Sequence, residues 1–217
     1  MRGKAMRKRR KKRRFLKKSL QFFLLLFLIL GSYLFYKNYR IYRQVTQLEQ
    51  EVRQATQTYG LTAYHDLVLA IIYTETKGQG SDPMQSSESA FGEVGFIQGT
   101  QESINQGVAY LAESLALAEE EKVDLATAIQ AYNFGLDYIY YIANRGGKND
   151  ISLAEEYSRD VLAPFLGNTT QAQYRYIKIP SLIYNGGYLY HNGGNLFYAD
   201  IVAWNQLKVK FFQFFLQ

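Results

Sequence analysis

The sequence predicts a mainly α-helical domain behind one N-terminal membrane-spanning helix. Residues 19–36 are almost wholly apolar and directly follow a strongly basic run. Beyond residue 59, apolar residues recur at the spacing of helix faces, between residues that suit helix starts and glycines that suit helix ends. We expect four segments: a basic cytoplasmic tail (1–18), a transmembrane helix (19–36), a helical stalk or first domain helix (37–58) and the domain (59–217).

The N-terminal segment has the features of an uncleaved signal anchor. Residues 1–18 contain twelve Lys or Arg residues and no acid. As a helix, the apolar stretch from Leu20 to Tyr36 would be about 25 Å long, near the lower limit for crossing a bilayer. No A-x-A-like cleavage site follows it. The basic flank predicts a single-pass protein of the cell membrane, with a cytoplasmic N-terminus and an extracellular domain in a Gram-positive-like envelope.

A nucleic-acid-binding tail is the alternative interpretation of residues 1–18. Their direct junction with the apolar stretch favours the anchor. Without this tail and the three basic residues Lys37, Arg40 and Arg43, ten basic and nineteen acidic residues remain, which is a formal charge of −9. An acidic domain repels nucleic acid, so we expect no nucleic-acid partner.

Residue composition excludes several kinds of chemistry. The chain has no cysteine, so it contains neither a disulfide nor a thiolate nucleophile. His65 and His191 are the only histidines, and neither has a second candidate ligand three or four positions away, which argues against a zinc hydrolase. We expect no metal and no organic cofactor.

Residues 37–58 extend the apolar helix outward, with Val45, Leu48, Val52 and Ala55 at helical spacing. A stalk, a first domain helix and a dimerising stripe all fit this pattern. One short stripe does not establish a coiled coil, so the oligomeric state stays open.

A second helix is predicted from Tyr64 to about Thr76. Residues 67–72 have no polar side, which is typical of a helix buried on most of its surface. Gly78 and Gly80 then give the stop signal. The glycine- and serine-rich residues 78–100 are predicted to form a long loop, and such loops are usually functional.

Capping signals predict the next three helices. Ser103 and Gln106 form a capping box at the start of one helix. Asp124 is predicted to be the N-cap of another helix, which meets Gly135. A further helix is predicted over residues 137–143 before two glycines.

The remaining sequence is less regular. A capping box at residues 152–155 opens a helix that Pro164 is expected to stop. Asn-Gly-Gly turns within residues 174–195 suit short hairpins or irregular loops. Asn195 is predicted to cap a last helix. Its phenylalanine-rich end, residues 211–216, is too short to span a membrane and is expected to pack on the domain.

Glu75 is the residue whose position points most clearly to a catalytic role. It lies in the last turn of the predicted apolar helix, where the negative end of the helix dipole and apolar neighbours both raise a carboxyl pKa. A carboxylic acid that stays protonated near neutral pH is what glycoside cleavage needs, because the leaving oxygen must receive a proton. The alternative is a solvated residue at a helix end.

The residues from Glu75 onward also carry a resemblance. The run ETKGQGSDPMQSSES, residues 75–89, resembles the E-S-x-G-x-G-x-D-x-M-Q-S-S-E-S signature of bacterial lysozyme-like domains related to goose-type lysozyme, which occur in bifunctional cell-wall hydrolases. The similarity continues through SINQGVAY (103–110), QAYNFG (130–135) and YNGGY (184–188), and it covers nearly all of residues 60–205. QAYNFG also resembles the A-Y-N-x-G element of lytic transglycosylases. Thr76 departs from the family's usual Ser, and both carry a hydroxyl.

The resemblance implies cleavage of the β-1,4 bond between N-acetylmuramic acid and N-acetylglucosamine in peptidoglycan, with Glu75 as general acid. Glu88 is the preferred second carboxylate, as a water-orienting base or charge stabiliser, and a role in loop solubility is its alternative. Asp82, before Pro83, is expected to form a turn. The candidate substrate contacts are Gln85, Ser86, Ser87, Tyr132, Asn133 and Tyr184. A core aromatic is the alternative role for Tyr132.

The sequence therefore indicates a membrane-anchored muramidase that acts on peptidoglycan glycan strands, with residues 19–36 as its contact with the membrane. A lytic transglycosylase that gives 1,6-anhydro products is the nearest alternative. A non-catalytic peptidoglycan-binding scaffold and a partner-binding module that uses residues 37–58 are the alternatives outside enzyme chemistry.

Overall fold

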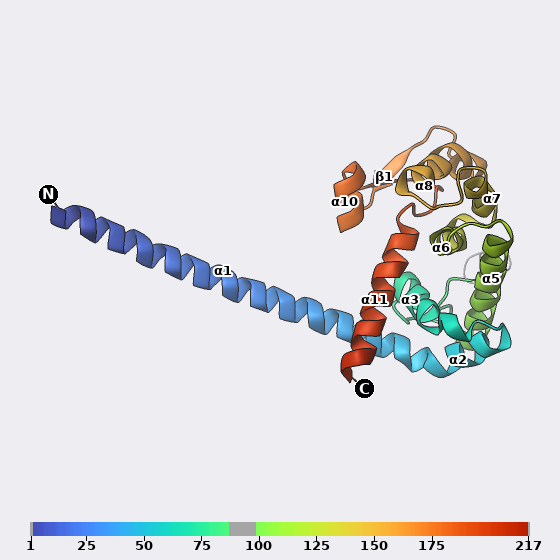
Figure 1. The fold of residues 1–217 in the computed structure, drawn as a ribbon, viewed down its shortest axis with the longest axis horizontal. Coiled ribbons are helices and arrows are strands. Elements are labelled where there is room, and N and C mark those ends of the chain that lie inside the picture. The colour runs from blue at the N-terminus through green and yellow to red at the C-terminus, as the bar shows by residue number, and fades with distance from the viewer. Residues whose placement is uncertain (1, 87–98, 217) are drawn as a thin grey trace. The chain divides into compact units, whose positions relative to one another are not determined.

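The computed structural model describes residues 2–86 and 99–216 and is mainly helical, which confirms the predicted fold class (Figure 1). The chain divides into two compact units, residues 1–41 and residues 42–217. The candidate site lies in the second unit.

The first helix, α1, runs from Arg2 to Val45. Among the described residues, it contains the stretch that is long and apolar enough to cross a membrane. Its apolar side chains between Leu20 and Tyr36 are about half exposed or more. A soluble domain would bury such side chains, so the stretch has the character of a candidate membrane span.

The second unit starts with the last turn of α1, a short 3₁₀ turn η1 (Thr46–Leu48) and α2 (Glu49–Thr58). Val45, Val52 and Ala55 are fully buried. Three of the four apolar positions predicted at helical spacing within residues 37–58 thus pack inside this unit, and Leu48 is half-buried.

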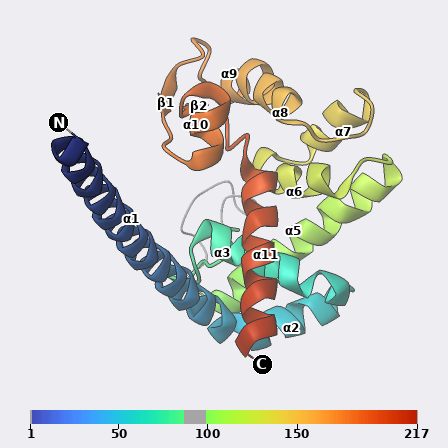
Figure 2. The same ribbon diagram turned by 60° about the vertical axis from the view of Figure 1, so that its left-hand side comes forward.

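Two helices pack against each other at the centre of the unit (Figure 2), and their hydrogen bonds show that they run antiparallel. The first is α3 (His65–Glu75), preceded by the 3₁₀ turn η2 (Thr62–Tyr64), and the second is α11 (Tyr198–Leu216). Asn205 of α11 donates to the hydroxyl of Thr74 at 2.9 Å, and Gln213 donates to Asp66 at 3.0 Å. The start of α11 is thereby fixed beside the end of α3.

The helices α5 (Thr100–Glu120), α6 (Leu125–Phe134) and α7 (Asp137–Ala143) pack against one another beside this pair. Asp124 caps α6 by accepting from the backbone N–H of Thr127 at 2.9 Å, and Gly135 ends it with φ of 90°, as predicted. The predicted helix start at Ser103 is wrong, because α5 begins at Thr100. Ser103 is buried, and its hydroxyl bonds to Asp82 instead of capping its own helix.

The next helical stretch differs from the prediction at both ends. It consists of α8 (Ile151–Tyr157), the π-helical turn η3 (Ser158–Leu162) and α9 (Ala163–Phe165). Asp150 is the N-cap of α8 and accepts from the N–H groups of Ser152 and Leu153, so the predicted capping box is wrong. Pro164 does not stop the helix, because it lies in the first turn of α9, where its missing N–H costs nothing.

A small antiparallel pair completes the fold, with β1 (Gln173–Arg175) beside β2 (Tyr188–Tyr190) and α10 (Ile179–Asn185) between them in sequence. The two strands are connected through α10, so the Asn-Gly-Gly segment at residues 185–187 ends a helix and does not form the tight turn of a short hairpin. The inner side chain of β2, Leu189, joins the core formed by α6, α7 and α8.

Candidate active site

The candidate site is built around the carboxyl group of Glu75 at the end of α3. Residues 67–72 of this helix are at most 1% exposed, so they anchor it firmly in the core. The helix ends where Lys77 and Gly78 adopt left-handed conformations, with φ of 61° and 75°. A Cβ on Gly78 would lie 3.0 Å from backbone atoms of Gln44, and glycine permits this close approach.

One oxygen of the Glu75 carboxyl is held by a residue of α11. The hydroxyl of Tyr198 donates to Oε1 of Glu75 at 2.5 Å. Burial raises the pKa of the Glu75 carboxyl, the hydrogen bond from Tyr198 lowers it, and the negative charge of Asp82 raises it. The net direction is upward because burial is the largest of the three effects.

Two tyrosine rings stack beside this carboxyl. The rings of Tyr132 and Tyr198 are nearly parallel, at 7°, with their centroids 6.2 Å apart. Burial and the negative charge of Glu75 raise the pKa of both hydroxyls well above the ordinary value, so both remain donors. Tyr132 donates to the carbonyl oxygen of Met84 at 3.1 Å, which links α6 to the loop that follows Glu75.

Gly107 of α5 makes room for this link. A Cβ at position 107 would lie 2.8 Å from the Sδ atom of Met84 and 2.8 Å from the hydroxyl oxygen of Tyr132. No side chain with a Cβ fits there without moving its neighbours.

The described part of the loop, residues 76–86, is held by buried polar groups. Thr76 donates to the carbonyl oxygen of Pro83 at 2.9 Å. Oδ1 of the buried Asp82 accepts from the Ser103 hydroxyl at 2.6 Å and from the Ser86 N–H at 3.0 Å. Asp82 thus joins the turn to α5, a role that goes beyond the predicted one of forming the turn.

The two predicted contacts on this part of the loop differ in exposure. Ser86 is 1% exposed, and its hydroxyl donates to the carbonyl oxygen of Ser103 at 2.9 Å. Gln85 is exposed, adopts a left-handed conformation with φ of 50°, and donates to the carbonyl oxygen of Asp82 at 3.1 Å. Ser87 and Glu88 lie outside the described residues.

Asn133 and Gln130 connect α6 to the segment before α11. Oδ1 of Asn133 accepts from the N–H of Asn195 at 2.7 Å. Gln130 is fully buried, donates to the carbonyl oxygen of Asn195 at 2.9 Å and accepts from the N–H of Ala199 at 3.1 Å. These bonds fix the position of Tyr198, which lies between the two bonded residues.

Tyr184 of α10 packs against Phe197, in the segment before α11. Its ring meets the ring of Phe197 edge-on, at 6.0 Å between centroids, and its hydroxyl donates to Glu155 at 2.9 Å. Burial, with the bond to Glu155 next, raises the pKa of Tyr184 to about 12. The residue is 37% exposed, so part of its ring faces solvent.

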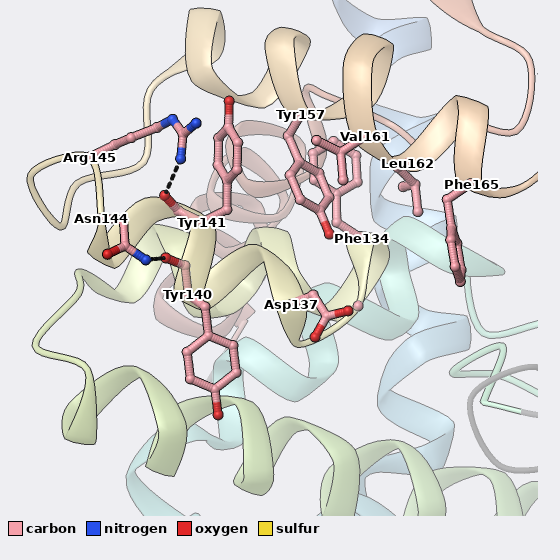
Figure 3. Close-up of a pocket in the computed structure, with 11 residues that line it drawn as sticks. Phe134, Asp137, Tyr140, Tyr141, Asn144, Arg145, Tyr157, Val161, Leu162 and Phe165 are labelled. Atoms are coloured by element: carbon pink, nitrogen blue, oxygen red, sulfur yellow. Dashed lines mark hydrogen bonds between the residues drawn. The ribbon is translucent and has the colours of Figure 1, made fainter. Parts of the chain in front are cut away.

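A separate pocket of about 560 Å³ opens beyond the end of α6. Figure 3 shows its aromatic lining, which includes Tyr140, Tyr157 and Phe165. The guanidinium of Arg145 lies over the ring of Tyr141, 3.6 Å from its centroid. The predicted site residues do not line this pocket.

The sequence did not identify Tyr198, the direct partner of Glu75. The two residues are 123 positions apart, and nothing near Tyr198 distinguishes it from the other tyrosines. Gln130 could have been found, because it opens the QAYNFG motif on the same helix as Tyr132 and Asn133.

Fold and site together define a class: a helical domain that carries a partly buried glutamate at a helix end, held by a tyrosine from a distant helix. The chain belongs to the lysozyme-like family, whose model matches residues 42–206.

Three relatives illustrate this membership. Pneumococcal vaccine antigen A of Streptococcus pneumoniae serotype 4 is 45% identical over 193 residues, which is 87% of this chain and 94% of that protein. The bifunctional muramidase/DL-endopeptidase CwlT of Bacillus subtilis is 32% identical over 94 residues, which is 43% of this chain and 28% of that protein. A crystal structure of a lipoprotein-like protein of the NLP/P60 family from Staphylococcus aureus superposes with a TM-score of 0.68 at 32% identity, over 76% of this chain and 52% of that chain. The resemblance that the sequence motifs carried is thereby confirmed.

Proposed function

We propose that this protein is a membrane-anchored glycosidase that cleaves the β-1,4 bond between N-acetylmuramic acid and N-acetylglucosamine in peptidoglycan. The observation that carries the proposal is the Glu75 carboxyl, whose pKa is raised by burial and whose Oε1 is held by Tyr198. Membership of the lysozyme-like family and similarity to a protein named as a muramidase support the substrate class.

In this proposal Glu75 acts as general acid. Because Oε1 accepts the bond from Tyr198, the proton of the neutral carboxyl belongs on Oε2. Oε2 gives this proton to the glycosidic oxygen while the bond from that oxygen to the anomeric carbon breaks, and the sugar ring takes on oxocarbenium character. Water then adds to the anomeric carbon and gives one proton to the solvent, from which the Glu75 carboxylate is reprotonated. We propose Glu88 as the group that orients this water or stabilises the positive ring.

The glycan strand contacts residues around this carboxyl. We propose that Gln85, Asn133 and Tyr184 contact the sugars, since each is at least partly exposed. Asn133 uses Oδ1 within the domain, which leaves its side-chain N–H groups as donors to the sugar. Tyr132 shapes the site through its ring. Ser87 belongs to the same set, whereas we assign the buried Asp82 and Ser86 to holding the loop.

A lytic transglycosylase is the second candidate, and the surroundings of Asp82 favour it. Within the described residues, Asp82 is the acid whose charge acts on Glu75, and its Oδ1 is already committed to Ser86 and Ser103. A transglycosylase needs no second carboxylate, because the 6-hydroxyl of the muramic acid attacks the anomeric carbon and returns a proton to the glutamate. Its product has a 1,6-anhydro end.

We further propose that α1 anchors the enzyme in the cell membrane, with the N-terminus in the cytoplasm and the domain outside. The apolar stretch within α1 and the basic residues that precede it support this orientation. Tethering limits cleavage to wall within reach of the membrane and raises the local enzyme concentration there.

Digestion of purified peptidoglycan by the full-length chain in detergent tests the proposal. Glu75→Gln keeps the acceptor for Tyr198 but has no acidic proton, so we expect cleavage to fall by about 10²–10⁴-fold. Glu156→Gln is the matched control, because Glu156 also accepts from a tyrosine, Tyr141, at 2.7 Å. Equal cleavage by parent and Glu75→Gln would overturn the assignment.

Mass spectrometry of the products, with and without borohydride, separates the two reactions. Ends that borohydride reduces indicate hydrolysis, whereas 1,6-anhydro ends indicate transglycosylation. Binding of peptidoglycan without any cleavage by the parent would instead identify a scaffold.

A further inference from the structure

Helix α11 carries two apolar faces on opposite sides. Val202, Val209 and Phe212 are at most 3% exposed and form the face toward α3. The other face, here called the aromatic stripe, consists of residues that are 45–78% exposed: Trp204, Leu207, Phe211, Phe214 and Phe215.

The aromatic stripe is a regular helical feature. Its members follow the i, i+3, i+7, i+10, i+11 spacing of one helix face, at about 100° per residue. Its rings touch one another, since Phe211 lies 4.7 Å from Phe215 and Phe214 lies 5.0 Å from Phe215 between centroids. Lys208 and Lys210 flank it, one on each side. A large exposed apolar surface of this kind marks an interaction site.

The C-terminal end of α11 contacts Tyr42, which lies close in sequence to the apolar stretch of α1. The ring of Phe212, in the last turns of α11, stacks on the ring of Tyr42 at 5.2 Å. Tyr42 follows Tyr36, the last residue of the apolar stretch, by six residues of continuous helix, which corresponds to about 9 Å. If the apolar stretch crosses a bilayer, the membrane surface therefore lies within about 10 Å of Tyr42, measured along the chain.

The basic residues that follow the apolar stretch and those beside the aromatic stripe are consistent with a lipid partner. Lys37, Arg40 and Arg43 lie between the apolar stretch and the end of α1, and Lys208 and Lys210 border the stripe. From residue 44 onward the chain carries a formal charge of −9, so the two lysines beside the stripe differ in sign from most charged residues of this part. Aromatic rings beside Lys and Arg are the composition of helices that lie in an anionic membrane interface.

We propose that the aromatic stripe of α11 lies in the headgroup region of the bilayer and binds anionic lipid, as a second membrane contact besides the anchor. This inference rests on the proposed membrane anchoring by α1. Phe214 and Phe215, the most exposed members of the stripe, enter the interface, and the exposed Lys210 contacts lipid phosphates. Lys208 bonds to Asn205 within the domain. The domain is then held in one orientation on the membrane.

The chain offers a direct probe, because Trp204 is its only tryptophan. We would place the double variant Trp204→Phe/Phe215→Trp, as the full-length chain, in nanodiscs containing brominated phosphatidylglycerol. Bromine quenches a tryptophan only on close contact, and residues of a helix buried about 5–10 Å into the interface meet it. The matched control is Trp204→Phe/Tyr140→Trp, with its reporter on α7 at a site that is 46% exposed.

We expect the fluorescence at position 215 to be quenched about threefold more than at position 140, and to be quenched less in discs of neutral lipid. Adding Phe211→Gln and Phe214→Gln should remove most of the difference. Equal quenching at both positions in an inserted chain would overturn the proposal, as would a blue-shifted but unquenched reporter, which would indicate a protein partner or a second copy.

Failure of the chain to insert in the disc would overturn the anchoring and this inference together. Cleavage of peptidoglycan in detergent is measured separately, so loss of the lipid contact and loss of the proposed enzymatic function are distinguishable.

Discussion

Tyr198 and Glu75 are joined by a hydrogen bond of 2.5 Å, although they are 123 residues apart in the chain. This bond joins the start of α11 to the end of α3. It gives the carboxyl a fixed orientation and opposes the rise in its pKa that burial produces.

Tyr198→Phe removes this bond, and we expect two effects. The pKa of Glu75 rises further, because the bond favours the ionised carboxylate. A general acid works only while protonated, so the alkaline limb of the pH–rate profile moves to higher pH, while loss of orientation lowers the maximal rate by about tenfold. Tyr141→Phe, which removes a bond to Glu156, is the control and should leave the position of that limb unchanged. A limb that moves to lower pH would contradict this account of Glu75.

Asp82→Asn should move the same limb in the opposite direction. The negative charge of Asp82 raises the pKa of Glu75, so its removal lets Glu75 ionise at lower pH. The variant is measured as a pH–rate profile beside Asp160→Asn, which removes an exposed acid paired with Arg159. An unchanged limb in Asp82→Asn would mean that its charge does not reach Glu75.

Glu75→Gln should change how stability depends on pH. The folded-state pKa of Glu75 is raised, so the folded chain holds this proton to higher pH than the unfolded chain does. Stability from this group is therefore present at low pH and is lost as pH rises from about 4.5, the ordinary value, through the folded-state pKa. Thermal melts should show that the stability of Glu75→Gln, relative to that of the parent, increases as pH rises over that window. A constant difference between the two proteins would count against a raised pKa.

Gly107→Ala should disturb the site without touching a proposed catalytic group. The new Cβ would lie 2.8 Å from Met84 and from the hydroxyl oxygen of Tyr132, so the Tyr132–Met84 bond cannot keep its geometry. We expect a loss of about 1–3 kcal/mol in unfolding free energy, measured by denaturant titration, together with reduced cleavage. Gly31→Ala, which meets nothing within 4 Å, is the control. A fully stable Gly107→Ala would show that the contact relaxes at little cost.

The sequence predicted those features that depend on neighbouring residues. The buried character of residues 67–72, the N-cap at Asp124 and the stop at Gly135 are local, and all are confirmed. The position of Glu75 at a helix end followed from the same local signals.

Features that depend on distant residues were missed or wrong. Ser103 has the local pattern of a helix cap, yet its hydroxyl bonds to Asp82, 21 positions earlier. Pro164 has the pattern of a helix stop, but the π-helical turn before it places it where no N–H is needed. The tyrosine that holds Glu75 is supplied by packing of α11 on α3, and sequence spacing carries no information about that packing.

The pairing of α3 and α11 also fixes the separation along α11 between the Glu75 carboxyl and the Tyr42 contact. Tyr198, at the carboxyl, and Phe212, at the Tyr42 contact, are fourteen residues apart on one straight helix, or about 21 Å. If the aromatic stripe lies in the bilayer interface, α11 lies along the membrane, and the carboxyl at its start is held close to the lipid surface. The proposed enzyme would then meet only the innermost glycan.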